Sequence, residues 1–217
     1  MMTPPPGGGP MRRVARALGI TDETSIETLC AMASSQHLAR GCKLISEGET
    51  PRSISFPITG TLRTYFTDAA GHEVTDCIVN DISVPLIASA DTHAPSFETI
   101  EALTDCELVS VRITDLEQAI TVHPPLAAAY IKVLERAWYS QWSLRTVLRS
   151  MSARERYLWF LETYPGVIDL LTHRSIASFI NVTPVTLSRV RSALRHEGID
   201  PDTGLPAADG GQEPAGK

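Results

Sequence analysis

The pattern of apolar and polar positions along the chain changes near Arg112. Before this residue, apolar side chains alternate with polar ones in short segments, a period of two that is typical of β-strands. We expect strands over Ile54–Phe56, Leu62–Phe66, Glu73–Val79, Glu98–Leu103 and Glu107–Arg112, the first two joined across a turn that contains Gly60. Strands repeated at roughly ten-residue intervals predict a small β-roll, barrel or sandwich.

Helix starts are marked by three capping boxes, in which a Ser or Thr is followed three residues later by Glu. They lie at Thr24–Glu27, Thr114–Glu117 and Ser152–Glu155. The first box predicts a short helix that ends near Ala33. The Pro124-Pro125 pair ends or bends the second helix, and Pro165-Gly166 stops the third.

A single long helix is predicted from Leu126 to about Leu148, because apolar residues recur there with the helical period. They form two stripes, one with Tyr130, Val133, Ala137, Leu144 and Val147, the other with Ile131, Leu134, Trp138 and Trp142. A helix with two apolar stripes must be covered on two sides. One side is expected to pack on the strands, and the other is a candidate homodimer seam unless the whole helix is buried within its own subunit. The candidate dimer residues are Tyr130, Val133, Leu134, Ala137, Trp138, Leu144 and Val147.

Two shorter helices with a tight turn follow. The first is expected over about His173–Ile180 behind Thr172 as N-cap, and the second runs to His196 with Thr183 as N-cap and Pro184 at its first position. Asn181 suits the left-handed backbone that such a short turn needs. This outline is that of a helix-turn-helix.

The second of these helices separates an apolar face from a polar one. At 100° per residue, Leu187, Val190 and Leu194 form a buried stripe, and the opposite face starts near the helix N-terminus. Arg189 on that face is placed to bond guanine, and Val185 could meet a thymine methyl. Arg191 and Arg195 lie between the faces, as phosphate contacts or as plain solvated charges. The candidate DNA-binding residues are Arg174, Ser175, Thr183, Pro184, Val185, Thr186, Ser188, Arg189, Ser192 and Arg195.

Charge is distributed unevenly along the 217 residues. The formal net charge is −6 overall, but it is −8 over residues 1–129, +5 over 130–198 and −3 over 199–217. Such asymmetry indicates that the basic segment meets a polyanion, the alternative being arginines on a solvated helix face. No apolar run approaches the ~20 residues that span a bilayer, and no leader pattern opens the chain, so we expect a cytoplasmic protein without membrane contact.

Enzyme and metal-binding functions find little support in the chain. The four cysteines form no CxxC pair, and no two of the six histidines lie within four residues of one another. A nucleophile elbow, a phosphate-cradling glycine loop and a His-Glu-x-x-His motif are all missing. We therefore expect no enzyme activity, no metal site and no cofactor that the sequence identifies.

The stretch from Ser175 to Arg191 resembles the DNA-binding end of the CRP/FNR family of bacterial transcription regulators. Gly41–Glu49, Gly60 and Gly71–Glu73 resemble the cyclic-nucleotide-binding β-roll of the same family. The resemblance covers roughly residues 20–197. It implies a homodimer joined by the long helix, a roll that senses a small effector, and double-stranded DNA and RNA polymerase as partners.

This sequence departs from the family pattern at four places. The family often continues into a β-wing after the recognition helix, but residues 199–217 lack the alternating apolar residues to build one. The guanine-reading arginine of the family falls on Arg189, but the glutamate often found four positions earlier is Val185, which implies an altered base preference. The turn glycine is Asn181. Members that bind cyclic AMP carry an arginine-serine pair for the phosphate, whereas the matching region Asp81–Ile100 holds Pro95-Ser96-Phe97 and no arginine. A buried phosphate without a cationic partner is costly, so we expect no cyclic AMP binding.

The sequence therefore predicts an α+β protein with an antiparallel β-roll of the double-stranded β-helix type. We expect a flexible segment over 1–19, the roll over 20–123, the dimerisation helix over 124–150, the helix-turn-helix domain over 151–198 and a flexible tail over 199–217. The predicted function is sequence-specific DNA binding as a homodimeric transcription regulator. The sequence identifies no effector for the roll, and DNA binding without any effector stays open. The alternative is a sensor or interaction module of the same fold that has lost DNA binding.

Overall fold

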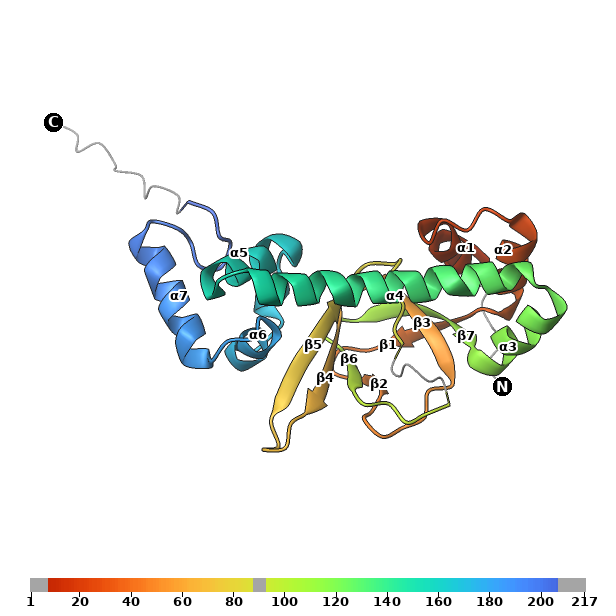
Figure 1. Ribbon diagram of the computed structural model, residues 1–217, viewed down its shortest axis with the longest axis horizontal. Helices are drawn as coiled ribbons and strands as arrows, with labels where there is room; N and C mark the ends of the chain where they lie inside the picture. Colours follow the sequence, from red (N-terminus) through yellow and green to blue (C-terminus); the bar gives the residue numbers. More distant parts are fainter. Residues whose placement is uncertain (1–7, 88–92, 207–217) are drawn as a thin grey trace. The chain divides into compact units, whose positions relative to one another are not determined.

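The computed structural model describes residues 8–87 and 93–206 (Figure 1). The chain forms two compact units, residues 1–146 and 147–217. The helix α4 (Pro125–Ser150) is continuous across the boundary between them, over nearly the range that its apolar periodicity predicts.

Two antiparallel sheets build the first unit (Figure 1). One sheet has the order β1-β7-β3, and the other has the order β2-β6-β4-β5. Their bounds are Ser34–Leu38 for β1, Lys43–Ile45 for β2, Ser53–Thr59 for β3, Leu62–Thr67 for β4, Glu73–Val79 for β5, Thr99–Ala102 for β6 and Cys106–Arg112 for β7. Leu38 and Leu108 of the first sheet share one apolar cluster with Leu62, Val79 and Ile100 of the second. The sheets thus enclose a common interior, which confirms the predicted roll.

The strands differ from the sequence prediction in two respects. β1 and β2 were not predicted, because Ser34–Leu38 is mostly polar and Lys43–Ile45 is too short to show an alternation. The strands on either side of Gly60, β3 and β4, belong to different sheets. Gly60 has a φ of 91°, and a Cβ there would lie 2.5 Å from Cys106 Sγ, so only glycine fits where the chain passes from one sheet to the other.

The outer face of the first sheet is covered by helices. These are α1 (Gly8–Ala17), α2 (Glu23–Met32), α3 (Ile113–Val122) and the first part of α4. Phe56 and Val109 of the sheet pack in one cluster with Val14 of α1, Leu116 of α3 and Val133 of α4. This cluster is the larger apolar core of the first unit.

The prediction of a flexible segment over 1–19 is wrong for residues 8–17. Met11, Val14 and Ala15 lie on one side of α1 and are fully buried in the core. The prolines and glycines of the first ten residues concealed this helical spacing. Residues 1–7 lie outside the described part of the chain.

Two of the three predicted capping boxes are wrong. α2 begins earlier, with the Asp22 side chain accepting a hydrogen bond from Ser25 N at 2.8 Å. α3 follows directly on β7, with Arg112 at the N-cap and no capping side chain. The third box is confirmed, because Ser152 and Glu155 each accept the other's backbone N–H at the start of α5 (Ala153–Thr163).

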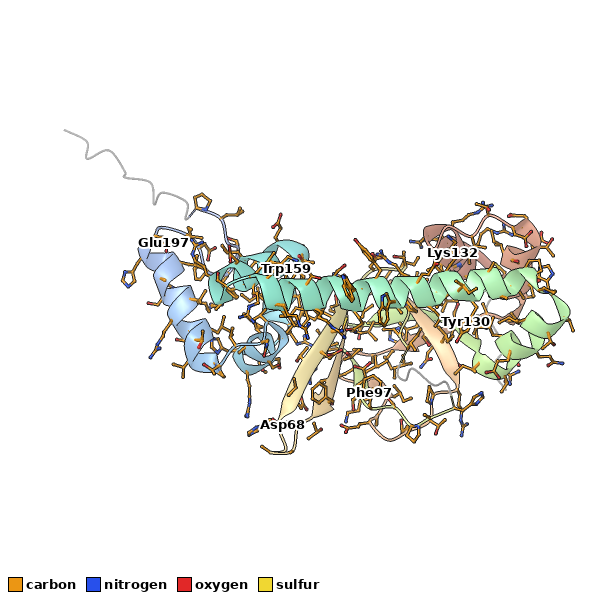
Figure 2. All side chains as sticks on the ribbon, in the orientation of Figure 1. Asp68, Phe97, Tyr130, Lys132, Trp159 and Glu197 are labelled. Carbon is orange, nitrogen blue, oxygen red and sulfur yellow. The ribbon has the colours of Figure 1, made fainter. Side chains whose placement is uncertain are left out.

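The second unit is a small helical domain with an aromatic core. It contains α5, the 3₁₀ helix η1 (Val167–Asp169), α6 (His173–Phe179) and α7 (Pro184–His196). Tyr157, Phe160 and Phe179 are fully buried, and the ring of Trp159 stacks on that of Phe179 (Figure 2 labels Trp159). Across the described residues, the chain has no helix whose length and hydropathy would let it span a membrane.

Candidate nucleic-acid interface

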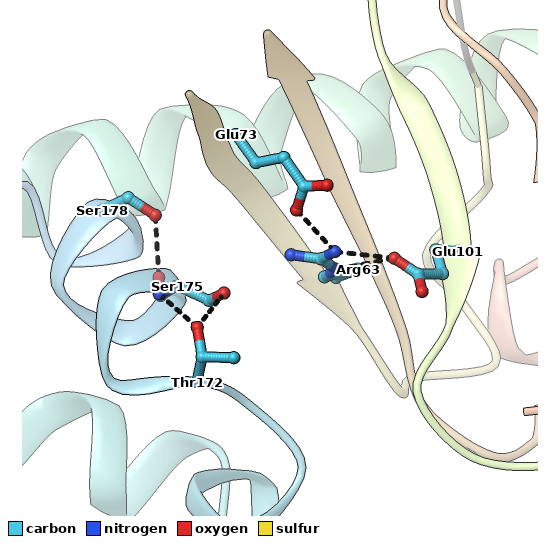
Figure 3. Close-up of polar contacts among 6 residues, drawn as sticks. All are labelled: Arg63, Glu73, Glu101, Thr172, Ser175 and Ser178. Carbon is cyan, nitrogen blue, oxygen red and sulfur yellow. Dashed lines mark hydrogen bonds and ion pairs between the residues drawn. The ribbon is translucent and has the colours of Figure 1, made fainter. Parts of the chain in front are cut away.

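The helix-turn-helix is formed by α6, α7 and the short turn between them, in which Asn181 and Val182 separate the C-cap Ile180 from the N-cap Thr183. Thr172 Oγ1 accepts the Ser175 N–H at 3.0 Å at the start of α6, as Figure 3 shows. Thr183 Oγ1 accepts the Thr186 N–H at 3.1 Å at the start of α7. Asn181 has a φ of 53°, the left-handed conformation that the sequence predicts. The caps and the turn are therefore confirmed, although α6 ends one residue earlier than expected, at Phe179.

Arg156 on α5 holds this turn through hydrogen bonds, a role that the sequence did not predict. Its Nη1 donates to the carbonyl oxygens of Ile180 at 2.7 Å and Asn181 at 3.0 Å. These carbonyls lie at the C-terminal end of α6, where no further turn of helix supplies donors. The partners are 24 and 25 residues apart, and no local spacing indicates such a contact.

α7 buries one face and exposes the other, as its periodicity predicts. Leu187 and Leu194 are fully buried, while Val185, Ser188, Arg189 and Ser192 are exposed. Within the described residues, Arg189 forms no hydrogen bond or ion pair, and the same holds for Arg174 at the start of α6 and for Arg195. Their guanidinium groups are therefore free to bind an anionic partner.

One predicted DNA-binding residue is displaced from this surface. Ser175 is buried, and its hydroxyl lies 2.8 Å from Thr172 Oγ1 (Figure 3). The Ser175 side chain takes part in the N-terminal cap of α6 and offers little surface to a phosphate. Its role in DNA binding stays a prediction.

Arg191 has neither of the two roles that the sequence left open for it. Its side chain is only 17% exposed. Nη1 donates to Tyr157 Oη and Nη2 donates to Asp202 Oδ1, each at 2.6 Å. Arg191 is therefore neither a solvated charge nor a free cation.

Residues 199–206 fold back onto the domain, so the prediction of a flexible tail is wrong there. Ile199 forms an antiparallel bridge with Pro206, and Tyr157 Oη donates to the carbonyl of Pro201 at 2.6 Å. These residues lack the alternation of a β-wing, and their order comes from polar contacts that the sequence pattern does not show. Residues 207–217 lie outside the described part of the chain.

The predicted dimer residues of α4 divide between two environments. Val133 and Leu144 are buried, and Tyr130 packs against the core of the first unit, so these side chains offer little surface to a partner. Ala137 and Val147 are half-buried. In contrast, the second stripe is open to solvent: Ile131 is 54% exposed, Leu134 43%, Trp138 68% and Trp142 56%. The rings of Trp138 and Trp142 stack at 6.3 Å between centroids.

The roll contains a polar cavity of about 680 Å³. Ser55 and Ser110 line it and share a hydrogen bond of 2.7 Å, while Leu86 and Ile100 form its apolar wall. Arg52 is the one basic side chain among the described residues that line it, and it is exposed. The volume lies within the range of small-molecule sites.

Arg63 does not point into this interior. Its neighbours Leu62 and Thr64 are buried on the inner face of β4, which places Arg63 on the outer face. There it donates to Glu101 Oε2 at 2.7 Å and to Glu73 Oε2 at 2.8 Å, as Figure 3 shows, and its guanidinium lies 4.2 Å from the Tyr65 ring centroid. Two carboxylates already neutralise this arginine.

A carboxyl group is buried in the region where the family's cyclic AMP-binding members carry their phosphate-binding pair. Glu98 is 6% exposed, and its Oε2 has no hydrogen-bond partner among the described residues. Burial raises the pKa of Glu98 to about 7; the nearby Thr64 hydroxyl lowers it and the Asp76 charge raises it further. Sequence reasoning missed this residue, because a single glutamate in a strand pattern reads as an exposed position.

The roll, the long helix and the helix-turn-helix with its unpaired arginines define a class, the DNA-binding transcription regulators with an effector-type domain. Family models agree with this class: the cyclic nucleotide-binding domain matches residues 35–123, and the Crp-like helix-turn-helix domain matches residues 147–200. The chain belongs to the CRP/FNR family of transcription regulators. This family is one of regulators and not a class of enzymes.

Relatives and solved structures agree with this assignment. The chain is 30% identical over 161 residues to the global nitrogen regulator of Synechocystis, covering 68% of this chain and 72% of the relative. FixK2 from Bradyrhizobium japonicum has a TM-score of 0.63 at 18% identity, covering 77% of this chain and 86% of that one. A protein from Eubacterium rectale, described as a candidate regulator of the crp/fnr family, has a TM-score of 0.66 at 17% identity, covering 83% and 87%.

Proposed function

We propose that this regulator acts as a homodimer that reads DNA with α7 and does not bind cyclic AMP. The DNA-binding part of this proposal rests on a difference in bonding among the arginine side chains of the second unit. Arg156 and Arg191 are bonded within the domain, whereas Arg174 and Arg189 have no partner among the described residues. Unpaired cations at the start of α6 and on the exposed face of α7 suit phosphates and a base edge, respectively.

The exposed stripe of α4 supports the homodimer. Ile131, Leu134, Trp138 and Trp142 follow one another at three- and four-residue intervals, so they form a continuous apolar strip along the helix. Exposed apolar strips of this kind mark protein interfaces, and a second copy of the same helix offers the matching surface. Two copies related by a two-fold axis would place their recognition helices in successive major grooves, about 34–36 Å apart.

The absence of cyclic AMP binding is supported by the charges around the roll. The outer-face arginine Arg63 is already paired, and the buried Glu98 supplies a carboxyl group and no positive charge to a phosphate placed beside it. The cavity lined by Ser55 and Ser110 offers hydroxyl groups to an effector of another kind. A titration with labelled cyclic AMP checks this, and saturable binding at micromolar concentration would contradict it.

We also propose that the protein works in the cytoplasm and meets RNA polymerase there. The DNA-binding proposal is tested first by the salt dependence of binding to a duplex of arbitrary sequence between 50 and 200 mM salt. Affinity that falls steeply with salt supports phosphate contacts. Binding that is absent at the lowest salt would favour the alternative of a module that no longer binds DNA.

Arg174→Ala is expected to weaken binding to all duplexes alike, because a phosphate contact carries no sequence information. Loss of one contact makes the slope of log K against log salt shallower by roughly 1. Glu162, exposed on α5 and without an ion pair in the described chain, supplies the control variant Glu162→Gln. An unchanged slope in Arg174→Ala would remove this residue from the phosphate contacts.

A further inference from the structure

Arg191 lies on the recognition helix but faces the inside of the domain. It is four residues after Leu187 and three before Leu194, so it shares the inward face of α7 with these two buried leucines. At 100° per residue, Arg191 lies roughly 160° away from Arg189, on the other side of the helix. A group that holds Arg191 therefore sets the direction in which Arg189 points.

Two groups bind the guanidinium of Arg191, the hydroxyl of Tyr157 and the carboxylate of Asp202. Tyr157 of α5 is completely buried, and its hydroxyl accepts a hydrogen bond from Arg191 Nη1. The same hydroxyl donates to the carbonyl of Pro201, and Arg191 Nη2 bonds Asp202, the next residue. The phenol of Tyr157 thus joins α5, α7 and residues 199–206 in one chain of short hydrogen bonds.

Hydrogen bonds within residues 199–206 hold this segment in one conformation, so it can fix the position of Arg191. Asp200 Oδ1 accepts the Asp202 N–H at 2.9 Å, Asp200 Oδ2 accepts the Thr203 hydroxyl at 3.0 Å, and the Ile199–Pro206 bridge closes the segment. The pKa of Asp200 is lowered, first by its bond to the Asp202 backbone N–H and then by the Thr203 hydroxyl. A charged arginine bonded to a buried phenol and to a braced carboxylate keeps few rotamers.

We propose that Arg191, Tyr157 and residues 199–206 form a clasp that fixes the rotation of α7, so that Arg191 is a positioning residue for base reading and not a DNA contact. The proposal rests on the proposed function, because it concerns how α7 meets DNA. The acidic residues of the clasp assist DNA binding, although their charge repels the polyanion.

This role makes predictions opposite to those of a phosphate contact. If Arg191 bound phosphate, Asp202→Asn would free its charge and strengthen binding, and Arg191→Lys would keep most of the affinity. If the clasp operates, both variants loosen α7. We expect each to lose about tenfold in affinity for the specific operator, the scale of one good base contact. Binding of Asp202→Asn to arbitrary DNA and its salt slope should change no more than those of the charge-matched variant Glu162→Gln.

The experiment compares Arg191→Lys, Asp202→Asn and the control Glu162→Gln, which removes one negative charge from an exposed site of the same domain. The specific operator is first selected with the wild-type protein, so a failure of DNA binding itself shows before any variant is made. Affinities are measured at least 20 °C below each variant's melting temperature. A role in folding alone would lower only that temperature and leave the affinities equal, which would overturn the proposal.

Two truncations give an independent measurement. A chain ending at Pro206 keeps the clasp and one ending at Gly198 removes it, while both remove negative charge overall. We expect the shorter chain to lose specific affinity and the longer one to keep it. Equal or tighter specific binding by the shorter chain, or a tighter complex with Asp202→Asn, would show that the segment acts only through its charge.

Discussion

Arginine side chains lie in three different environments in this molecule. Arg63 is neutralised by two glutamates on the outer face of β4, Arg156 and Arg191 are bonded inside the helical domain, and Arg189 remains free on the exposed face of α7. The sequence predicts the position of Arg189 from the helical period alone. It could not predict the positions of the others, because their partners lie 10 to 38 residues away in the chain, at no spacing that a local pattern shows.

Arg189→Ala should relax base preference at one position in each half-site. A bidentate arginine contact to guanine is worth ~1–3 kcal/mol, so specific binding should weaken by that amount per contact while binding to arbitrary DNA changes little. The measurement is a titration of operator duplexes that carry each of the four bases at every position. Full affinity with an unchanged preference would mean that another residue reads the base.

Glu98 gives the roll a characteristic dependence of stability on pH. Burial raises its pKa from 4.5 to about 7, so the folded protein binds a proton that the unfolded chain releases between these values. The free energy of unfolding should therefore fall as pH rises from 4.5 to 7, by up to about 3 kcal/mol, and the loss remains above pH 7.

Glu98→Gln removes this titration. Urea unfolding at pH 5 and pH 8 should show a smaller difference for the variant than for the wild type, whereas Glu27→Gln, the same change at an exposed site, should leave the difference as it is. If Glu98→Gln loses stability equally at both pH values, the carboxylate is stabilised by a partner and its pKa is not raised.

The elements follow from the sequence wherever one local signal dominates. Thr183 with Pro184, the Ser152–Glu155 box and the long apolar period of α4 each predict an element that the structure confirms. The prediction missed α1 because prolines and glycines obscure its helical spacing, and it missed β1 because the residues of this strand are mostly polar. Packing of Met11 and Val14 in the core of the first unit stabilises α1 as a helix.

Within α4, periodicity identified both stripes but not which one packs inward. Val133 belongs to the core of its own unit, and Trp138 is open to solvent. Both stripes are apolar in the sequence, so the packing of the other helices distinguishes them. The proposed dimer seam therefore rests on the exposed stripe.

Trp138→Glu should convert the proposed dimer to a monomer, because it places a charge in the middle of the apolar strip. The wild-type side chain is exposed, so folding of the chain should change little. Analytical ultracentrifugation measures the outcome, with Val122→Glu, a change at an exposed apolar residue of α3, as the control. Operator affinity should fall together with dimerisation, since a monomer contacts one half-site only.

At the scale of the whole molecule, the fold class, the order of domains and the family could be predicted from the sequence, since short strands, a long helix and a capped helix pair succeed one another along the chain. The C-terminal clasp and the buried carboxyl of Glu98 could not. Both depend on polar groups that meet across the fold, for which a single sequence carries no periodic signal.

Selection of bound duplexes from a random DNA library, with purified protein at moderate salt, tests the central claim of a homodimer that reads DNA through α7. We expect enrichment of a two-fold symmetric motif whose half-sites are one helical turn apart. The selection is repeated with a small-molecule extract so that a missing effector does not hide the result. No enrichment under either condition, or enrichment of a single asymmetric site, would contradict the claim.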